Sequence, residues 1–268
     1  MDGVKKSSMT SPHTADKYKC NICKDVGWVQ NGDGTWSRCK CYEKECIERL
    51  WANFGVKVAD VKKLNEYKPY DDRTAQAKNK AIQYLRTFDK IINTNENSFG
   101  LFGQAGSGKT HIIVAIGAAL LRREKDPVPV VYMPYLEAIR ELKANSMDDE
   151  YYAKLSGRYC TAKVLIIDDL FKDKIKNGKL MQDKYGHNVA LNEADMKHIY
   201  PILNYRYINH LPTLISTECT PQTLMELDEA LAGRILERCG SNMVVFQGEE
   251  YNFRMRKFVE AAANTEVS

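Results

Sequence analysis

Apolar and polar stretches alternate along most of this chain with two different periods. Short apolar runs bounded by polar or turn residues are typical of buried strands, and they occur at 98–102, 128–133, 162–169 and 212–217. Apolar positions at helical spacing predict helices at 111–116, 135–143, 149–159, 193–209 and 229–238. Strands that alternate with helices predict an α/β fold with a parallel sheet.

Ahead of the first predicted strand, the pattern divides the chain into smaller parts. A polar tail precedes an exposed amphipathic helix at about 42–50. Asp71 and Asp72 could cap a long helix whose apolar positions are Ala75, Ile82, Leu85, Phe88 and Ile92. We therefore predict an N-terminal domain at 1–55, a linker at 56–70 and a second domain at 71–268.

Composition narrows the class of protein. The chain has 268 residues, of which 44% are hydrophobic, enough for a sizeable core and about two domains. No apolar run reaches the roughly 18 residues of a membrane helix, and the polar N-terminus lacks the apolar stretch of a secretory signal, so we expect a cytoplasmic protein. The net charge of +4 permits contact with nucleic acid without requiring it.

One segment carries a strong chemical signal, because Gly103-Gln104-Ala105-Gly106-Ser107-Gly108-Lys109-Thr110 fits the phosphate-binding pattern G-x-x-x-x-G-K-[ST]. Small residues let such a loop curl around an anion, and the helix predicted to continue through His111 adds partial positive charge. Lys109 would reach the β- and γ-phosphates, and Thr110 would bind Mg²⁺. We predict that residues 103–111 bind ATP; the alternative is a glycine-rich turn that merely joins strand to helix.

A second signal is the apolar strand that ends in Asp168 and Asp169, a Walker B pattern. The carboxyl ends of strands form the ligand crevice of an open parallel sheet, so both carboxylates are expected beside the phosphate loop. Asp168 would hold Mg²⁺ through its water shell, and Asp169 would orient or deprotonate the attacking water. For Asp169 the alternative is a helix N-cap.

Four of the eight cysteines lie near the N-terminus at metal-ligand spacing. Cys20-x-x-Cys23 is followed, after fifteen residues, by Cys39-x-Cys41, with a hairpin turn predicted at Asn31-Gly32-Asp33-Gly34 between the pairs. Two thiolate pairs on two tight turns can converge tetrahedrally on Zn²⁺. The spacing therefore predicts a small zinc ribbon.

Metal bonds can fold a module whose own core is small, and the apolar candidates for that core are Val26, Trp28 and Trp36. Because Cys-x-Cys is the less regular half of the motif, Cys46 or His13 could replace one ligand. Buried thiols without metal are the remaining alternative.

Polar groups also follow the last strand predicted here, at 212–217. Ser216, Thr217 or Glu218 would face the γ-phosphate from the carboxyl end of this strand. The next helix carries Arg234 and Arg238, which lie four residues apart and so share one face.

The segment 171–192 is polar and reads as a surface excursion. Its lysines could contact nucleic acid, but we favour a solvated loop because Asp173 and Asp183 interrupt the run. The lysines are Lys172, Lys174, Lys176, Lys179 and Lys184.

The order of these parts resembles the AAA+ ATPases of the replicative-helicase loader family, the DnaC and DnaI type, which share an IstB-like core. The resemblance covers most of the chain and rests on 103–110, 165–171, 204–207, 214–217, 233–238 and 252–254. The cysteine module also looks like the N-terminal zinc module of Gram-positive and phage loaders. The implied fold is an AAA+ P-loop NTPase with a five-stranded parallel sheet, preceded by a small zinc-ribbon-like domain.

The resemblance also implies an activity and partners. An N-terminal domain would bind a hexameric replicative helicase, and an ATPase domain would assemble on it and bind single-stranded DNA. Arg234 or Arg238 would be the arginine finger, and Arg254 the sensor-two arginine. Many family members have Asn where this chain has Glu218, so the sensor role falls to Thr217 or needs a different geometry.

Other functions stay open. A transposition helper ATPase of the IstB type shares the same core, although the leading zinc ribbon argues against it. A non-enzymatic adaptor that uses bound ATP only structurally is kept open by Glu218. A P-loop kinase for small molecules offers no place for the late arginine helix.

Overall fold

The structure is a computed structural model that describes residues 18–176, 179–188, 191–248 and 252–253. Contacts along the chain divide it into two compact units, residues 1–49 and 50–268. The boundary falls within one helix, α1 (Lys40–Phe54). Among the described helices, none combines the length and apolar character needed to cross a membrane.

The first unit is built on a short antiparallel hairpin of β1 (Trp28–Gln30) and β2 (Trp36–Arg38). The connecting turn is closed by the Asn31 N–H, which donates to the Thr35 carbonyl at 2.8 Å. The guanidinium of Arg38 lies 3.9 Å from the centre of the Trp28 ring, so the aromatic side chain packs against a cation instead of an apolar core.

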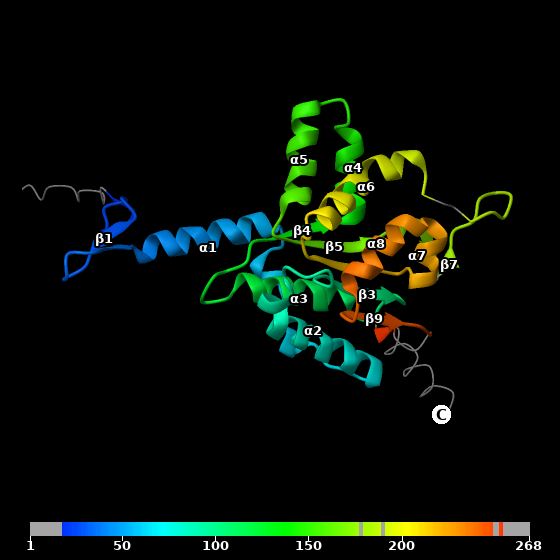
Figure 1. The fold of residues 1–268 in the computed structure, drawn as a ribbon, viewed down its shortest axis with the longest axis horizontal. Helices are drawn as coiled ribbons and strands as arrows, with labels where there is room; N and C mark the ends of the chain where they lie inside the picture. The colour runs from blue at the N-terminus through cyan, green and yellow to red at the C-terminus, as the bar shows by residue number, and fades with distance from the viewer. Residues whose placement is uncertain (1–17, 177–178, 189–190, 249–251, 254–268) are drawn as a thin grey trace, which may run out of the picture. The chain divides into compact units, whose positions relative to one another are not determined.

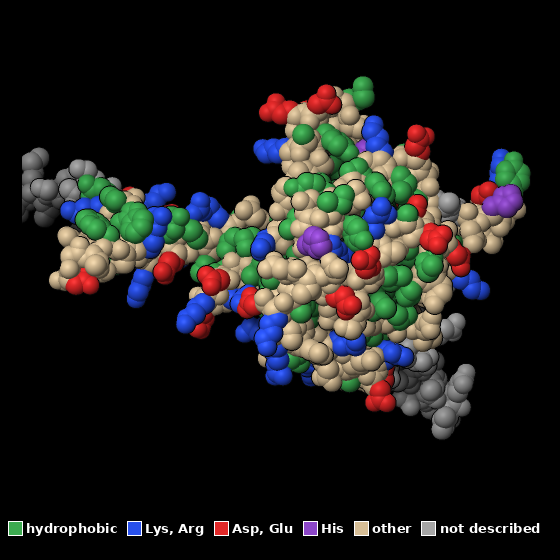
Figure 2. Space-filling model, viewed as in Figure 1, with side chains coloured by type: hydrophobic (Ala, Val, Ile, Leu, Met, Phe, Trp, Pro, Cys, Tyr) green, Lys and Arg blue, Asp and Glu red, His purple; other side chains and the backbone are tan. Residues whose placement is uncertain are grey.

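That arrangement contradicts the expected core of the first unit. Val26, Trp28 and Trp36 are 68%, 40% and 61% exposed, and hydrophobic side chains are visible on the surface of this unit (Figure 2). The reason is size, because strands of three residues offer too little surface to bury an aromatic ring on both sides.

The second unit is organised around a parallel sheet of five strands in the order β4-β5-β8-β3-β9 (Figure 1), which confirms the predicted fold class. The strands are β3 (Phe99–Gly103), β4 (Val130–Pro134), β5 (Val164–Leu170), β8 (Thr213–Thr217) and β9 (Met243–Phe246). The sequence located four of them and missed β9, an edge strand of only four residues.

Alternate residues of the central strands enter two separate cores. In β5, Val164 and Ile166 pack with α2 (Asp72–Ile91) and α3 (Lys109–Leu121). Leu165 and Ile167 point the other way. They meet α4 (Tyr135–Ala144), α5 (Asp149–Thr161), α6 (Glu193–Ile208), α7 (Pro221–Leu227) and α8 (Glu229–Cys239).

Helix α2 begins where the sequence predicts, and its buried side chains match the predicted apolar positions in part. Asp71 is its N-cap, and it accepts a bond of 2.7 Å from the Thr74 N–H in a reciprocal capping box. The buried side chains are Thr74, Ala77, Ala81, Tyr84 and Phe88. Of the apolar positions chosen from the sequence, Phe88 is among them, and Leu85 and Ile92 pack against the same core while partly buried.

Residues 56–70, expected to be a linker, pack against the second unit. Two 3-10 turns, Val58–Asp60 and Leu64–Glu66, shape the segment. Val61 and Tyr67 are buried in the core that α2 and α3 share. This segment therefore belongs to the second unit, and its Tyr67 contacts the loop that follows β3.

The lysine-rich insert after β5 contains the 3-10 turn Lys172–Lys174 and a short hairpin, β6 (Ile175–Lys176) and β7 (Lys179–Leu180). Lys174 is buried and lies 2.7 Å from the buried carboxylate of Asp195, which Lys143 contacts at 2.8 Å from α4. The base of the insert is thus fixed to α4 and α6 by charge pairs.

Arg206 is a fully buried cation of the second unit. Its guanidinium donates to carbonyl oxygens at the end of α5, including Ala162 at 2.8 Å, and its Nε donates to Thr213 Oγ1 at 2.9 Å. Burial lowers the pKa of Arg206 to about 9. The cation satisfies carbonyls that the helix terminus leaves without intrahelical partners.

Candidate functional site

The phosphate loop lies between β3 and α3, and residues distant in sequence close over it. Gly106 and Gly108 have φ values of 80° and 83°, a region that favours glycine. A side chain at Gly108 would meet the Tyr67 ring, and one at Gly106 would meet Asn252. The Tyr67 hydroxyl also donates to the Ser107 carbonyl at 2.9 Å. The loop is therefore held from outside as well as by its own curl.

Lys109 lies inside this curl. Its side chain is buried, and its Nζ donates to the carbonyls of Gly103 at 2.7 Å and Gln104 at 2.5 Å. His111, included in the predicted ATP site, turns its ring toward the segment before α2 and lies 3.1 Å from the Lys63 carbonyl. Lys109 therefore lies at the centre of the loop, whereas His111 faces away from it toward Lys63.

Asp168 joins the loop to the sheet. Thr110 Oγ1 donates to its Oδ1 at 2.9 Å, Ser216 Oγ donates to the same oxygen, and Tyr132 donates to Oδ2 at 2.8 Å. Burial and the Asp168 carboxylate raise the pKa of Tyr132, so this hydroxyl stays a donor. The structure brings the predicted pair Thr110 and Asp168 together and adds Tyr132, which no motif indicated.

Asp169 adopts a backbone conformation that is rare for a residue with a side chain. Its φ is 56°, and its N–H donates to Ser216 Oγ at 2.9 Å, where the pairing of β5 with β8 becomes irregular. The alternative of a helix N-cap is wrong, because Asp169 lies within β5 and Phe171 precedes the next helical turn.

At the end of β8 the two sensor candidates face different surroundings. Thr217 is fully buried, and its hydroxyl donates to the Leu170 carbonyl at 2.7 Å. Glu218 instead lines a cavity of about 880 Å³ together with Gly103, Gln104 and Ala105 of the phosphate loop. The side chain at this strand end that faces the loop cavity is therefore Glu218.

The arginines of α8 also differ. Arg238 is buried and donates within its own chain to the carbonyls of Asn95 at 3.2 Å and Tyr207. Arg234 donates to Ala230 in its own helix, lies over the rings of Tyr200 and Tyr207, and lines a separate surface cavity. Arg254 lies outside the described residues. These contacts make Arg234 the more accessible of the two.

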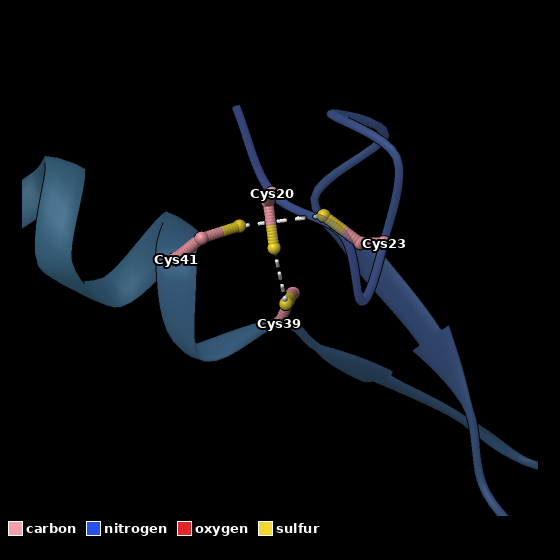
Figure 3. A group of neighbouring side chains, drawn as sticks. All are labelled: Cys20, Cys23, Cys39 and Cys41. Carbon is pink, nitrogen blue, oxygen red and sulfur yellow. Dashed lines mark hydrogen bonds between the residues drawn. The ribbon is translucent and has the colours of Figure 1, made fainter. Parts of the chain in front are cut away.

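The four N-terminal cysteines converge on one point (Figure 3). Their sulfur atoms all lie within 4.8 Å of one another, with Cys20 and Cys39 at 3.8 Å and Cys23 and Cys41 at 3.3 Å. Sulfur atoms of a tetrahedral zinc site are about 3.8 Å apart, since each Zn–S bond is about 2.3 Å. The donor set fits Zn²⁺.

The turn that carries the first pair is prepared for thiolate ligands. Backbone N–H groups of Cys23 and Ile22 lower the pKa of Cys20 to about 7. Asp25 fixes the same turn, because its carboxylate accepts from the Cys20 N–H at 2.8 Å. Cys46 instead accepts a bond from Arg49 and is not part of the cluster, and His13 lies outside the described residues.

Fold and phosphate loop together define an AAA+ P-loop nucleotide-binding protein. The chain belongs to the IstB-like ATP-binding protein family, whose sequence profile matches residues 44–261. It is 34% identical over 253 residues to the phage-like element PBSX protein XkdC of Bacillus subtilis (strain 168), covering 90% of this chain and 87% of that protein.

Replication proteins are also among the similar proteins. The replicative helicase loader DnaC of Escherichia coli (strain K12) is 26% identical over 182 residues, which cover 67% of this chain and 64% of DnaC. A crystal structure of the DnaC helicase loader superposes with a TM-score of 0.51 at 23% identity, over 75% of this chain and 99% of that chain. The structural likeness concerns the fold alone.

Proposed function

We propose that this protein is an ATPase that binds a hexameric replicative helicase and places it on single-stranded DNA. The main observation behind this proposal is the contact between Thr110 and Asp168 beside the buried Lys109. In P-loop enzymes this arrangement holds a nucleoside triphosphate and its metal ion. The similarity to DnaC supports helicase loading over other uses of the same core.

In this proposal Thr110 and Asp168 would hold Mg²⁺, since both offer oxygen ligands and Thr110 Oγ1 lies 2.9 Å from Asp168 Oδ1. The metal would neutralise charge on the phosphates. Lys109 would exchange the loop carbonyls it now contacts for phosphate oxygens. Asp169, displaced from regular strand geometry at the crevice, would orient the attacking water.

The N-terminal unit would bind one zinc ion through Cys20, Cys23, Cys39 and Cys41, and it would carry the helicase contact. Exposed apolar side chains on this small unit support that role, because such groups favour a protein partner. The side chains are Ile22, Val26, Trp28 and Trp36.

The ATPase units would assemble on the helicase, and an arginine finger would reach across to the neighbour's phosphates. Arg234 is the better candidate because it is half-buried, whereas Arg238 is buried and bonded to carbonyls of distant segments of its own subunit. Finger arginines contribute about 10³ to 10⁵ in rate in other phosphoryl-transfer enzymes. Arg234→Ala should therefore bind ATP but hydrolyse it slowly.

Mixing tests this assembly. Arg234→Ala and Asp169→Asn, each nearly inactive alone, should recover activity together, since one interface can then pair an intact finger with an intact water-orienting site. Arg238→Ala serves as the comparison, with a lower melting temperature expected from its lost internal contacts. No recovery with Arg234→Ala, but recovery with a stably folded Arg238→Ala, would move the finger to Arg238.

The loading role is tested by capture from a host lysate followed by reconstitution. The tagged protein should recover a hexameric helicase, and the purified pair should displace an oligonucleotide annealed to circular single-stranded DNA only with ATP and the loader present. A Trp36→Ser variant should weaken recovery without loss of ATP binding. Recovery of a transposase instead of a helicase would favour the transposition helper and reject the loader.

A further inference from the structure

The lysine-rich insert enters the wall of the phosphate-loop cavity. Lys172, Lys176 and Lys179 line it together with Gly103, Gln104 and Ala105. Lys176 and Lys179 are exposed to solvent, as the interpretation favoured from the sequence expects, whereas Lys172 is only 34% exposed. The arrangement places several cations close to a site built for phosphates.

Lys172 has a defined partner in that wall, because its ammonium group forms an ion pair with the carboxylate of Glu218. Glu218 is only 8% exposed and follows β8, the strand between β3 and β5. The phosphate loop follows β3, and Asp168 lies on β5. The end of β8 is therefore the position from which a side chain can face the terminal phosphate.

A buried carboxylate at this position opposes nucleotide binding by itself. Both Glu218 and a terminal phosphate are anionic, and their repulsion is strong where water is excluded. Lys172 compensates the charge of Glu218. Lys174 cannot take this part, because Asp195 and Asp173 hold its ammonium group at 2.7 and 3.3 Å.

We propose that Lys172 and Glu218 form a γ-phosphate-reading pair, in which Lys172 contacts the terminal phosphate of bound ATP and Glu218 holds the lysine in place when that phosphate is absent. The pair replaces a neutral sensor side chain at the end of β8. It also links the insert to the nucleotide, because Lys172 belongs to the turn at the insert's base. This inference rests on the proposed ATP-binding function.

The test compares ATP with ADP, because only ATP carries the terminal phosphate. Equilibrium affinities are measured with Mg²⁺ for the parent, Lys172→Met, Lys172→Arg, Glu218→Gln and the double variant Lys172→Met with Glu218→Gln. Lys184→Met is the matched control, since Lys184 lies in the same insert but does not line the cavity. Melting temperatures confirm that each variant is folded.

Lys172→Met should weaken ATP binding about tenfold or more and ADP binding less than about threefold, because one charge-assisted contact to the terminal phosphate is lost. The double variant should recover part of the ATP affinity, since the uncompensated carboxylate is gone. Lys172→Arg should retain most of the preference for ATP, and Lys184→Met all of it.

Equal losses for ATP and ADP in Lys172→Met would mean that the pair only supports the fold, and unchanged affinities for both nucleotides would mean that Lys172 does not reach the phosphate. Either result overturns the inference and leaves the proposed ATPase standing. A parent protein that binds neither nucleotide would overturn both.

Discussion

The two units of this protein hold their structures by different means. In the described part of the first unit, the buried apolar residues are Cys23 and Cys39, whereas Ile22 and Val26 are 74% and 68% exposed. The second unit encloses two large apolar clusters, one on each face of its sheet. We therefore expect the first unit to depend on metal bonds to its cysteine sulfurs, whereas the second is stabilised by burial of apolar surface. Substitutions in one unit should therefore leave the stability and ligand binding of the other unit unchanged.

The largest effect should follow removal of the cysteine ligands. With Cys20 and Cys23 both changed to Ser, the first unit should lose about one zinc ion per chain and its ordered hairpin, because zinc binding to small modules is worth about 10–16 kcal/mol. The second unit should keep its melting temperature and ATP affinity. Metal analysis measures the zinc content, and two-dimensional NMR reports whether the hairpin is ordered. Cys46→Ser is the control, and full zinc retention by the double variant would exclude these ligands.

The reverse perturbation is Lys109→Ala. ATP affinity should fall about a hundredfold or more, because the central cation of the loop is lost, while zinc content stays unchanged. A fluorescent ATP analogue measures the first quantity and metal analysis the second. Lys90→Ala, an exposed change at the end of α2, should bind as the parent does. Undiminished binding by Lys109→Ala would refute the phosphate-loop assignment.

Packing of the second unit is tested at Arg206. Arg206→Leu leaves buried carbonyls without donors, including those of Ala162 and Pro212, so the free energy of unfolding of this unit should fall by about 3–5 kcal/mol. Urea unfolding monitored by far-UV circular dichroism measures this free energy. The exposed substitution Arg140→Leu should change stability little, and a similar loss in both variants would remove the special role of Arg206.

The smallest expected effect concerns how the stability of the second unit changes at acid pH. Burial raises the pKa of Asp195, but bonds from Lys143 and Lys174 outweigh it and hold the pKa below its usual value of 3.8. A depressed pKa gives stability that is present above about pH 4 and lost as pH falls through the folded-state value. Asp195→Asn should lower stability at pH 7 by about 1–2 kcal/mol and flatten the acid dependence of the second unit. An unchanged acid slope would contradict this.

Local patterns were sufficient for much of the second unit. The phosphate loop, the strand ending in Asp168 and the cap at Asp71 are specified by adjacent residues, and each lies where it was predicted. The convergence of the four cysteines also follows from spacing alone. Such features depend on backbone geometry over a few residues.

The remaining features depend on contacts between distant segments. Tyr132 meets Asp168 only because β4 and β5 are neighbours in the sheet, and Arg238 is buried only because α8 packs beside Tyr207. The pairing of Lys172 with Glu218 joins residues 46 positions apart. No periodicity or motif contains this information, so the sequence predicted Asp168, Lys172, Glu218 and Arg238 as candidates but not their partners, and it did not indicate Tyr132.

The glycines of the phosphate loop have a consequence for exchange between related proteins. Space at Gly106 is taken by Asn252 and space at Gly108 by Tyr67, so the loop is shaped jointly by segments before and after the sheet. A chimera that receives the phosphate loop of another protein also needs residues at positions 67 and 252 that fit against that loop. Functional recombinants should therefore inherit positions 67, 106, 108 and 252 as one block, and natural variation at these positions should be correlated.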